Sequence, residues 1–238
     1  MIETWQHELR NAAQPEKIKI FTSFFKTGKG EYGEGDIFIG LTVPFNRAIA
    51  RHYSNAPLET IGLMLKHEIH EFRLSGFLAL VERFKKCKSA EERKSITEFY
   101  VSHGTNANNW DLVDQSAPYI LGAYLVDNPD STLLDNLSRS DNLWLQRIAI
   151  VSTLMLIRHN RFADTLRIAK RYMTHPHPLI HKATGWMLRE TGKRDEATLL
   201  HFLDTYAGSL PRTALRYAIE RLSPEKRRYY MDIPQKNR

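Results

Sequence analysis

The sequence predicts an all-α fold in which antiparallel helix pairs stack into a solenoid. Two observations support this prediction: nearly every segment repeats its apolar residues every three or four positions, and the breaks between these segments are short. Hydrophobic residues make up 42% of the chain, which is enough to bury a core. No strict sequence period is present, so the repeats are degenerate, and a compact helical bundle is the structural alternative.

The expected helices follow one another along most of the chain. The longest is Leu58–Phe84, in which Gly76 is a weak point or break. A buried helix is expected over Leu143–Ile157, because its apolar positions keep a helical spacing. Prolines at 57, 129, 176, 178 and 211 fit helix starts or inter-helix turns. The other expected helices cover Glu92–His103, Leu112–Val126, Phe162–Thr174, Leu179–Thr191, Glu196–Tyr206 and Thr213–Leu222.

One segment, Lys26–Gly40, is expected to be a loop because glycine is concentrated in it. It lacks the residue order of a phosphate-binding loop and carries acidic side chains, so a connector is favoured over a binding loop. The only alternating apolar piece begins at Ile37–Ile39, and it is too short to build a sheet.

Composition restricts the classes of function. The net charge is +7, with 34 basic against 27 acidic residues, which suits a polyanionic partner but is also common in other soluble proteins. No apolar run is long enough for a membrane helix, and the first residues do not resemble a signal peptide. The single cysteine, Cys87, allows no internal disulfide, so we expect a cytoplasmic protein. His67 and His70 are three apart rather than four, so no zinc-protease motif is present and no metal is expected.

The first group of residues with chemical potential is the sequence Trp110–Asp114. Asn108 or Asn109 can cap a new helix there, and Asp111 would lie in its first turn. Trp110 and Asp114 are four apart and share one helix face, so an indole and a carboxylate could together stabilise a cation. The alternative is a half-buried tryptophan beside an ordinary surface carboxylate.

The second group is the start of the helix over 143–157. Asp141 can cap this helix, whose face carries Trp144 and Arg147. An arginine inside an apolar stretch is costly unless it is paired or faces a cleft. Arg147 is therefore either part of a structural salt bridge, for example with Asp114, or a site residue that reaches a phosphate.

The third group is a series of basic residues near helix ends in the C-terminal half. Gly192 is expected to stop a helix there, and basic side chains spread over successive repeats could follow a phosphate backbone. The alternative is a solvated charged surface, which we favour for the cluster 226–228. The group comprises Trp186 and the basic residues Arg189, Lys193, Arg194, Arg212, Arg216 and Arg221.

Taken together, these segments resemble the AlkD-like DNA glycosylases, a family of DNA alkylation repair enzymes. The resemblance runs through most of the chain and is strongest in three motifs that occur in order. They read W-D-x-V-D (Trp110–Asp114), D-N-x-W-x-Q-R (Asp141–Arg147) and K-A-x-G-W-x-L-R-E (Lys182–Glu190). The glycine-rich loop departs from what the resemblance leads us to expect, so it gives no guide to the contacts of the N-terminal region.

The resemblance implies a single domain over residues 1–238, a superhelical solenoid of HEAT-like helix-pair repeats with a concave basic face. Residues 1–40 would form the N-terminal helices and loop, and residues 41–238 the repeats. It also implies an alkylpurine DNA glycosylase, acting in base excision repair on cationic N3- and N7-alkylpurines such as 3-methyladenine and 7-methylguanine in duplex DNA. Family members need not flip the base into an enclosed pocket.

By the same resemblance, Asp114 matches the catalytic carboxylate, and Trp110, Arg147 and Trp186 match residues that line the cleft. The basic residues Arg189, Lys193, Arg194 and Arg212 are expected to contact DNA. A monomer that needs no cofactor, metal or membrane is expected. The alternative from a different class is a non-catalytic HEAT-repeat module that binds damaged or branched DNA, or a protein partner.

Overall fold

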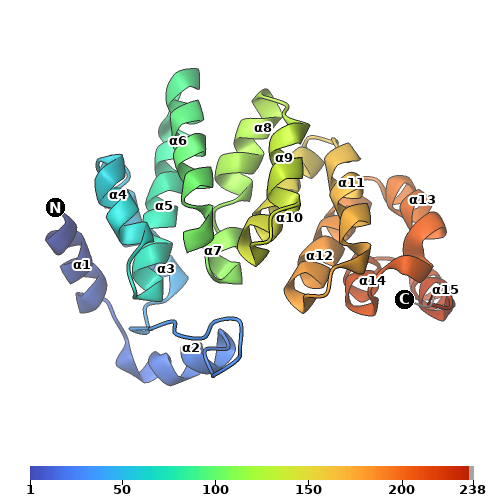
Figure 1. The fold of residues 1–238 in the computed structure, drawn as a ribbon, viewed down its shortest axis with the longest axis horizontal. Coiled ribbons are helices and arrows are strands. Elements are labelled where there is room, and N and C mark those ends of the chain that lie inside the picture. Colours follow the sequence, from blue (N-terminus) through green and yellow to red (C-terminus); the bar gives the residue numbers. More distant parts are fainter. Residues whose placement is uncertain (236–238) are drawn as a thin grey trace. The chain divides into compact units, whose positions relative to one another are not determined.

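The computed structural model describes residues 1–235, and nearly all of its regular structure is helical (Figure 1). Short 3-10 turns and one π-helical turn (Pro118–Gly122) connect the α-helices. The described residues contain no strand, only an isolated bridge between Ile37 and Ile69, so the predicted all-α class is confirmed. The helices are α1 Ile2–Asn11, α2 Ile18–Phe24, α3 Val43–His52, α4 Leu58–Leu65, α5 His70–Lys86, α6 Ala90–Ser102, α7 Trp110–Asp114, α8 Ala123–Asp127, α9 Ser131–Ser138, α10 Leu143–Arg158, α11 Ala163–Arg171, α12 Pro178–Arg194, α13 Glu196–Tyr206, α14 Arg212–Ala218 and α15 Pro224–Asp232.

The chain divides into two compact units, Met1–Leu121 and Gly122–Arg238. Each unit has its own arrangement of helices and its own buried side chains, and each is described separately below. The single-domain organisation implied by the resemblance stays a prediction.

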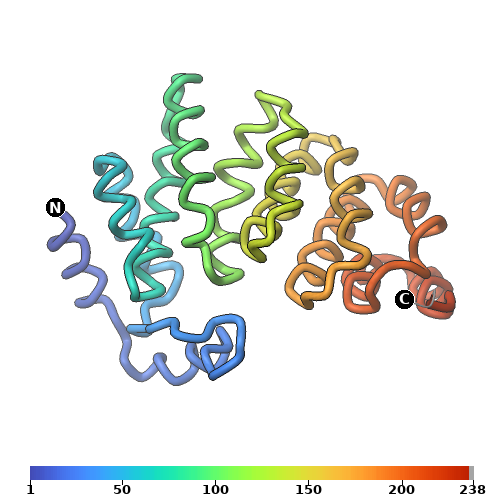
Figure 2. Tube along the Cα trace, viewed as in Figure 1, coloured from blue at the N-terminus to red at the C-terminus, as the bar shows by residue number. Residues whose placement is uncertain are grey.

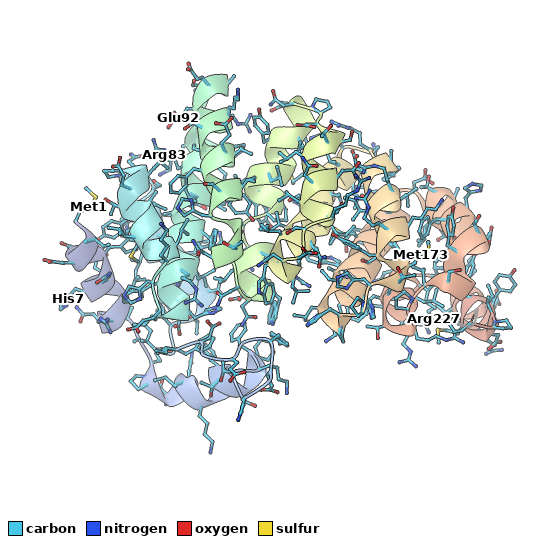
Figure 3. The ribbon with its side chains drawn as sticks, in the orientation of Figure 1. Met1, His7, Arg83, Glu92, Met173 and Arg227 are labelled. Carbon is cyan, nitrogen blue, oxygen red and sulfur yellow. The ribbon has the colours of Figure 1, made fainter. Side chains whose placement is uncertain are left out.

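In the first unit, α5 is the central helix. It packs most extensively against α3 and α4, and it also contacts α6 and α7. Almost all its residues are buried, including Phe72 and Phe77, because neighbours surround it on every side. The ion pair between Arg83 and Glu92, both labelled in Figure 3, links α5 to α6 with a nitrogen–oxygen distance of 3.1 Å.

In the second unit, α10, α12 and α14 pack side by side in one layer, and α9, α11 and α13 pack against them in another. Gly185 brings α12 against α14: a Cβ atom at this position would lie 2.4 Å from the carbonyl oxygen of Ala214. Consecutive helices thus alternate between two layers, which is the packing of a helical-repeat solenoid. The predicted degenerate helix pairs are confirmed.

The structure corrects the boundaries of two predicted helices. The segment Leu58–Phe84 breaks at residues 66–69, between α4 and α5, and not at Gly76. Gly76 instead allows α4 to approach α5, since a Cβ there would lie 2.8 Å from Cδ2 of Leu65. The segment Leu112–Val126 is interrupted by the π-helical turn between α7 and α8.

Two local expectations in the C-terminal half are also wrong. Asn142, and not Asp141, caps α10, because its side chain accepts hydrogen bonds from the backbone of Trp144 and Leu145. Gly192 lies inside α12 and does not end it; a Cβ there would lie 2.4 Å from Cδ2 of Leu199. At the start of α10 the neighbouring residue forms the cap, and at Gly192 the close packing of Leu199 accompanies a helix that continues past the glycine.

The glycine-rich segment Lys26–Gly40 is a loop, as predicted, and it returns the chain from α2 towards α3 (Figure 2). Its last residues are fixed by Glu71 on α5, whose carboxylate accepts hydrogen bonds from the backbone amides of residues 39–41 at 2.9–3.2 Å. Gly40 has a φ of 84°, and a Cβ there would lie 2.0 Å from the carbonyl oxygen of Gln14, so no larger residue fits.

None of the helices within residues 1–235 combines the length and the apolar character that crossing a membrane requires.

Candidate functional site

The short helix α7 carries the first predicted group of site residues. Asn109 caps this helix, since its side chain accepts a hydrogen bond from the Trp110 amide at 2.9 Å, as one of the two capping predictions stated. Trp110 and Asp114 are both half-buried, at opposite ends of the helix. Burial and the nearby charge of Asp114 hold the pKa of Tyr100 above its ordinary value.

The first carboxylate of the same motif, Asp111, is buried. Its Oδ2 atom lies 2.9 Å from Nε2 of His70, and Nδ1 of His70 lies 3.1 Å from Oδ2 of Asp36. Burial alone would lower the pKa of His70, but the flanking carboxylates, Asp111 foremost, raise it to about 9. His70 is therefore a buried cation at neutral pH, held between two carboxylates.

Asp36 connects the glycine-rich loop to this cation. It is also paired with Arg73 on α5, and it accepts hydrogen bonds from the side chains of Asn108 and Asn109 at 3.3 Å. Burial opposes its charge, but the hydrogen bond to His70 and the charge of Arg73 outweigh this and hold the pKa of Asp36 below its ordinary value. The loop, α5 and the start of α7 are thereby fixed to one another.

An aromatic cluster surrounds Trp110. The ring of Phe25 stacks on the indole with centroids 5.2 Å apart, and Phe24 meets its edge at 5.5 Å. Phe38 stacks on the other side of this group, 5.1 Å from Phe25 and 4.5 Å from the imidazole of His70. The end of α2 thus supplies the rings that contact Trp110, and Phe38 of the loop packs against one of them, Phe25.

A largely apolar pocket of about 340 Å³ lies in this part of the first unit. Five aromatic, four aliphatic and five polar or charged residues form its wall. Asp111 is among them, and its Oδ1 atom is buried without a hydrogen-bond partner. The lining residues are Phe21, Phe24, Phe25, Phe38, Leu41, Thr42, Val43, Pro44, His70, Glu71, Leu74, Trp110, Asp111 and Gln115.

In the second unit, Arg147 lies on α10 and is only 5% exposed. Its Nη1 atom donates a hydrogen bond to the carbonyl oxygen of Leu179, at 2.7 Å, and so connects α10 to the first turn of α12. A buried arginine with such a bond has a structural role in the second unit. Its predicted pairing with Asp114 would join the two units and stays a prediction.

The helix α12 carries most of the remaining predicted residues. Trp186 is half-buried on it. Arg189 pairs with Glu220 and Glu190, and Lys193 donates to Glu190 at 2.7 Å. Lys193 and Arg194 are exposed in the last turn of α12.

Arg212, at the start of α14, is engaged by the backbone of the C-terminal residues. Its guanidinium donates hydrogen bonds to the carbonyl oxygens of Met231, at 2.8 Å, and Ile233, at 3.4 Å. This contact holds the end of α15 against α14. Arg212 would have to share this guanidinium to contact DNA as well.

Two histidines of the second unit, His175 and His177, lie just before α12. Nε2 of His175 lies 2.8 Å from Oε1 of Gln146, and Nδ1 of His177 accepts from the amide of Leu179 at 3.1 Å. Burial lowers the pKa of both histidines, so both are neutral at pH 7.

Among residues 1–235, no group of three or more His, Cys, Asp or Glu side chains is arranged to hold a metal ion.

Sequence reasoning missed the residues that build the surroundings of Trp110. The sequence draws attention to His70 only through the spacing of a zinc-protease motif, and it does not distinguish Asp36 from the other acidic residues of the loop. Nothing in the local sequence indicates that they meet Asp111. The signal that was present is the pair Phe24 and Phe25 before the loop, since two adjacent aromatics at a helix end need a packing partner.

Comparisons with known proteins agree with this architecture. The model of a family described as "DNA alkylation repair enzyme" matches residues 5–222. Among solved structures, the chain is similar to a "Predicted DNA alkylation repair enzyme from Enterococcus faecalis", with a TM-score of 0.67 and 19% sequence identity, over 89% of this chain and 97% of that chain. No curated protein matches the sequence.

Proposed function

Because the chain belongs to the DNA alkylation repair enzyme family, we propose that it is a DNA glycosylase specific for alkylated purines. Family membership supports a role in the repair of alkylation damage. The finer proposal is that the enzyme hydrolyses the N-glycosidic bond of purines alkylated at N3 or N7 in duplex DNA, as a monofunctional glycosylase in base excision repair.

The chemistry of this reaction needs few protein groups. An N3- or N7-alkylated purine carries a positive charge, so the electron pair of the breaking glycosidic bond neutralises it and no general acid is required. Positive charge then develops on the deoxyribose, where an anionic carboxylate can stabilise it and orient a water. The water oxygen bonds to C1′ and its proton goes to solvent, leaving an abasic site and a free base.

The observation that carries the proposal is the contrast between the two carboxylates of α7. Asp111 is 4% exposed and engaged by His70, whereas Asp114 is half-buried at the end of the helix. A catalytic carboxylate has to be reachable by the sugar of the lesion. Asp114 meets this requirement and Asp111 does not, which supports Asp114 as the catalytic residue.

The tryptophans are proposed to contact the lesion. Trp110 and Trp186 are both half-buried, which is compatible with contact to a ligand. Aromatic faces favour cations through their quadrupole, which suits an alkylpurine. We further propose that Arg147 lines the cleft and that Lys193 and Arg194 contact phosphates; Arg189 and Arg212 remain proposed contacts that would have to share their present partners.

The second candidate function is non-catalytic binding, in which the protein is a scaffold that binds damaged or branched DNA, or a protein partner. The solenoid packing alone favours it, since helical repeats often form interaction surfaces. A half-buried carboxylate one helical turn from a half-buried indole argues against it, because a carboxylate repels the DNA backbone.

The test is a base-release assay on alkylated DNA. Duplex DNA treated with a methylating agent is incubated with the protein, and the released bases are separated by chromatography. Release of 3-methyladenine or 7-methylguanine supports the glycosylase, whereas salt-dependent binding to the same DNA without release supports the scaffold.

A further inference from the structure

A cluster of charged side chains connects α3 to α5 in the first unit. Glu82 on α5 is only 8% exposed, and its carboxylate accepts a hydrogen bond from Nζ of Lys85 at 3.0 Å. Two arginines of α3 face the same carboxylate: Nη1 of Arg47 lies 3.9 Å from its Oε1 atom, and Nε of Arg51 lies 3.6 Å from its Oε2 atom. One carboxylate thus gathers three cations from two helices.

The cluster as a whole is positive. Burial of Glu82 opposes its charge, but Lys85 and the two arginines outweigh this and hold the pKa of Glu82 below its ordinary value. Glu82 is therefore ionised at neutral pH, and within the cluster one negative charge faces three positive charges. A single cation would neutralise this carboxylate, so the cluster has more positive charge than an ion pair between two helices requires.

The cations of the cluster are accessible although its carboxylate is not. The side chains of Arg51 and Lys85 are 58% and 48% exposed, whereas that of Glu82 is 10% exposed. Because ion pairs at the protein surface contribute little to stability, exposed cations at these positions add little to the fold. Arginine has five N–H donors and lysine three, so the cluster keeps donors for a ligand while the buried carboxylate holds them in place.

The cluster adjoins the end of α7. Nη2 of Arg47 donates a hydrogen bond to Oε1 of Gln115, the residue that directly follows Asp114. Nζ of Lys85 lies 5.5 Å from the ring centre of Tyr119, in the π-helical turn after α7. These contacts fix Arg47 and Lys85 at a second point and place the cluster beside the end of the helix that carries the proposed catalytic carboxylate.

From these observations we infer that the three cations form a binding site for a phosphate of the DNA backbone, and that Glu82 positions them. The inference rests on the proposed function, which brings duplex DNA to the end of α7. Phosphate oxygens are anionic acceptors, and a guanidinium group binds them with two parallel hydrogen bonds. The other phosphate contacts that we propose belong to the second unit, so this site gives the first unit its own contact with the DNA backbone.

Glu82 acts on an approaching phosphate in two opposite ways. Its negative charge repels the phosphate, whereas its ion pairs hold three long side chains in place before the phosphate arrives. Free arginine and lysine side chains lose much rotamer freedom when a ligand fixes them, so this prior positioning favours binding. If repulsion prevailed, Glu82→Gln would strengthen DNA binding; because positioning prevails in the inferred site, the substitution weakens it.

The experiment is fluorescence anisotropy of a labelled, undamaged DNA duplex with the wild type, Glu82→Gln and Arg51→Gln over a series of salt concentrations. The controls come from an exposed ion pair of α6, in which Nζ of Lys94 lies 3.8 Å from Oε1 of Glu98. Glu98→Gln changes the net charge as Glu82→Gln does, and Lys94→Gln changes it as Arg51→Gln does. We expect binding to weaken about threefold in Glu82→Gln and about fivefold in Arg51→Gln, which also lowers the slope of log affinity against log salt by about 1. Both controls should stay within about twofold of the wild type.

The inference is overturned if Glu82→Gln binds DNA as tightly as the wild type or more tightly, or if Arg51→Gln binds no more weakly than Lys94→Gln. Circular dichroism checks the fold of each variant. Should Glu82→Gln prove unfolded, Glu82→Asp replaces it: aspartate keeps the charge but withdraws the carboxylate from the cations, so DNA binding should again weaken, and unchanged binding overturns the inference.

The same protein samples are assayed for release of 7-methylguanine from methylated duplex DNA. Release by the wild type together with unchanged DNA binding by Arg51→Gln rejects the phosphate site and keeps the glycosylase. DNA binding that weakens in the expected variants, without release by the wild type, supports the phosphate site and rejects the glycosylase.

Discussion

Oδ2 of Asp111 lies 2.9 Å from Nε2 of His70, and this contact distinguishes the two carboxylates of the W-D-x-V-D motif. Asp111 is part of the buried framework that holds the loop, α5 and α7 together. Asp114, four residues from Trp110, is the carboxylate that remains half-buried. We propose that Asp111 has a structural role and that Asp114 is the catalytic carboxylate.

The His70 cluster predicts that stability falls as the pH becomes alkaline. His70 has a pKa of about 9 in the folded protein and about 6.5 when unfolded. Its contribution is therefore fully present below pH 6.5 and is lost as the pH rises through 9, by roughly 1 to 3 kcal/mol. Urea unfolding at pH 6.5 and pH 9.5 measures this loss, and the variant His70→Gln should lose less over the same interval. An equal loss in both proteins would contradict the assignment.

The close approach of α12 and α14 predicts that Gly185→Ala is destabilising. The new methyl group would lie 2.4 Å from the Ala214 oxygen and 2.5 Å from Cβ of Tyr217, which forces the helices apart. We expect a loss of about 2 kcal/mol in the free energy of unfolding. Gly62→Ala is the control, since its nearest neighbour would be an ordinary 3.4 Å away and alanine favours the helix. Equal effects of the two substitutions would argue against the close packing.

Arg147 is predicted to contribute to stability through the carbonyl oxygen of Leu179. Arg147→Met keeps the aliphatic stem but leaves that buried carbonyl without this donor, at a cost of about 1 to 3 kcal/mol. Arg158→Met, an exposed position on the same helix, should change stability by less than about 0.5 kcal/mol. Thermal unfolding of both variants checks this. If Arg147→Met proves as stable as the wild type, Arg147 does not stabilise the fold, and the only role left for it is the proposed one of lining the cleft.

Lys193 and Arg194 are predicted to contact phosphates. The double variant Lys193→Gln/Arg194→Gln should bind duplex DNA more weakly and lower the slope of log affinity against log salt by about 1 to 2. Replacing Arg227 and Arg228 by glutamine removes the same charge from an exposed stretch that we interpret as a solvated surface. Fluorescence anisotropy over a series of salt concentrations compares the two. Identical slopes in the two double variants would mean that DNA affinity depends only on the net charge, and not on phosphate contacts at Lys193 and Arg194.

The sequence was a good guide to the fold because helical periodicity and turn residues act locally. The bounds of α13 were predicted to the residue, and the Asn109 cap was among the predicted alternatives. The break between α4 and α5 was missed because it depends on a distant contact: the loop passes beside residue 69, where Ile37 forms an isolated bridge with Ile69.

The candidate site was predicted only in part, for a similar reason. Local spacing placed Trp110 and Asp114 on one helix, as observed. The different environments of Asp111 and Asp114 depend on Asp36 and His70, which are 75 and 41 residues before Asp111 along the chain. No spacing rule connects residues so far apart, so the buried cluster could be found only from the structure.

The central claim, catalysis by Asp114, is tested most directly by single-turnover release of 7-methylguanine from methylated duplex DNA. The wild type, Asp114→Asn and the exposed-carboxylate control Glu59→Gln are compared at saturating enzyme, with circular dichroism to check folding. We predict that Asp114→Asn lowers the rate by about a hundredfold or more at unchanged fold, whereas Glu59→Gln matches the wild type. Release by Asp114→Asn at the wild-type rate would contradict the claim.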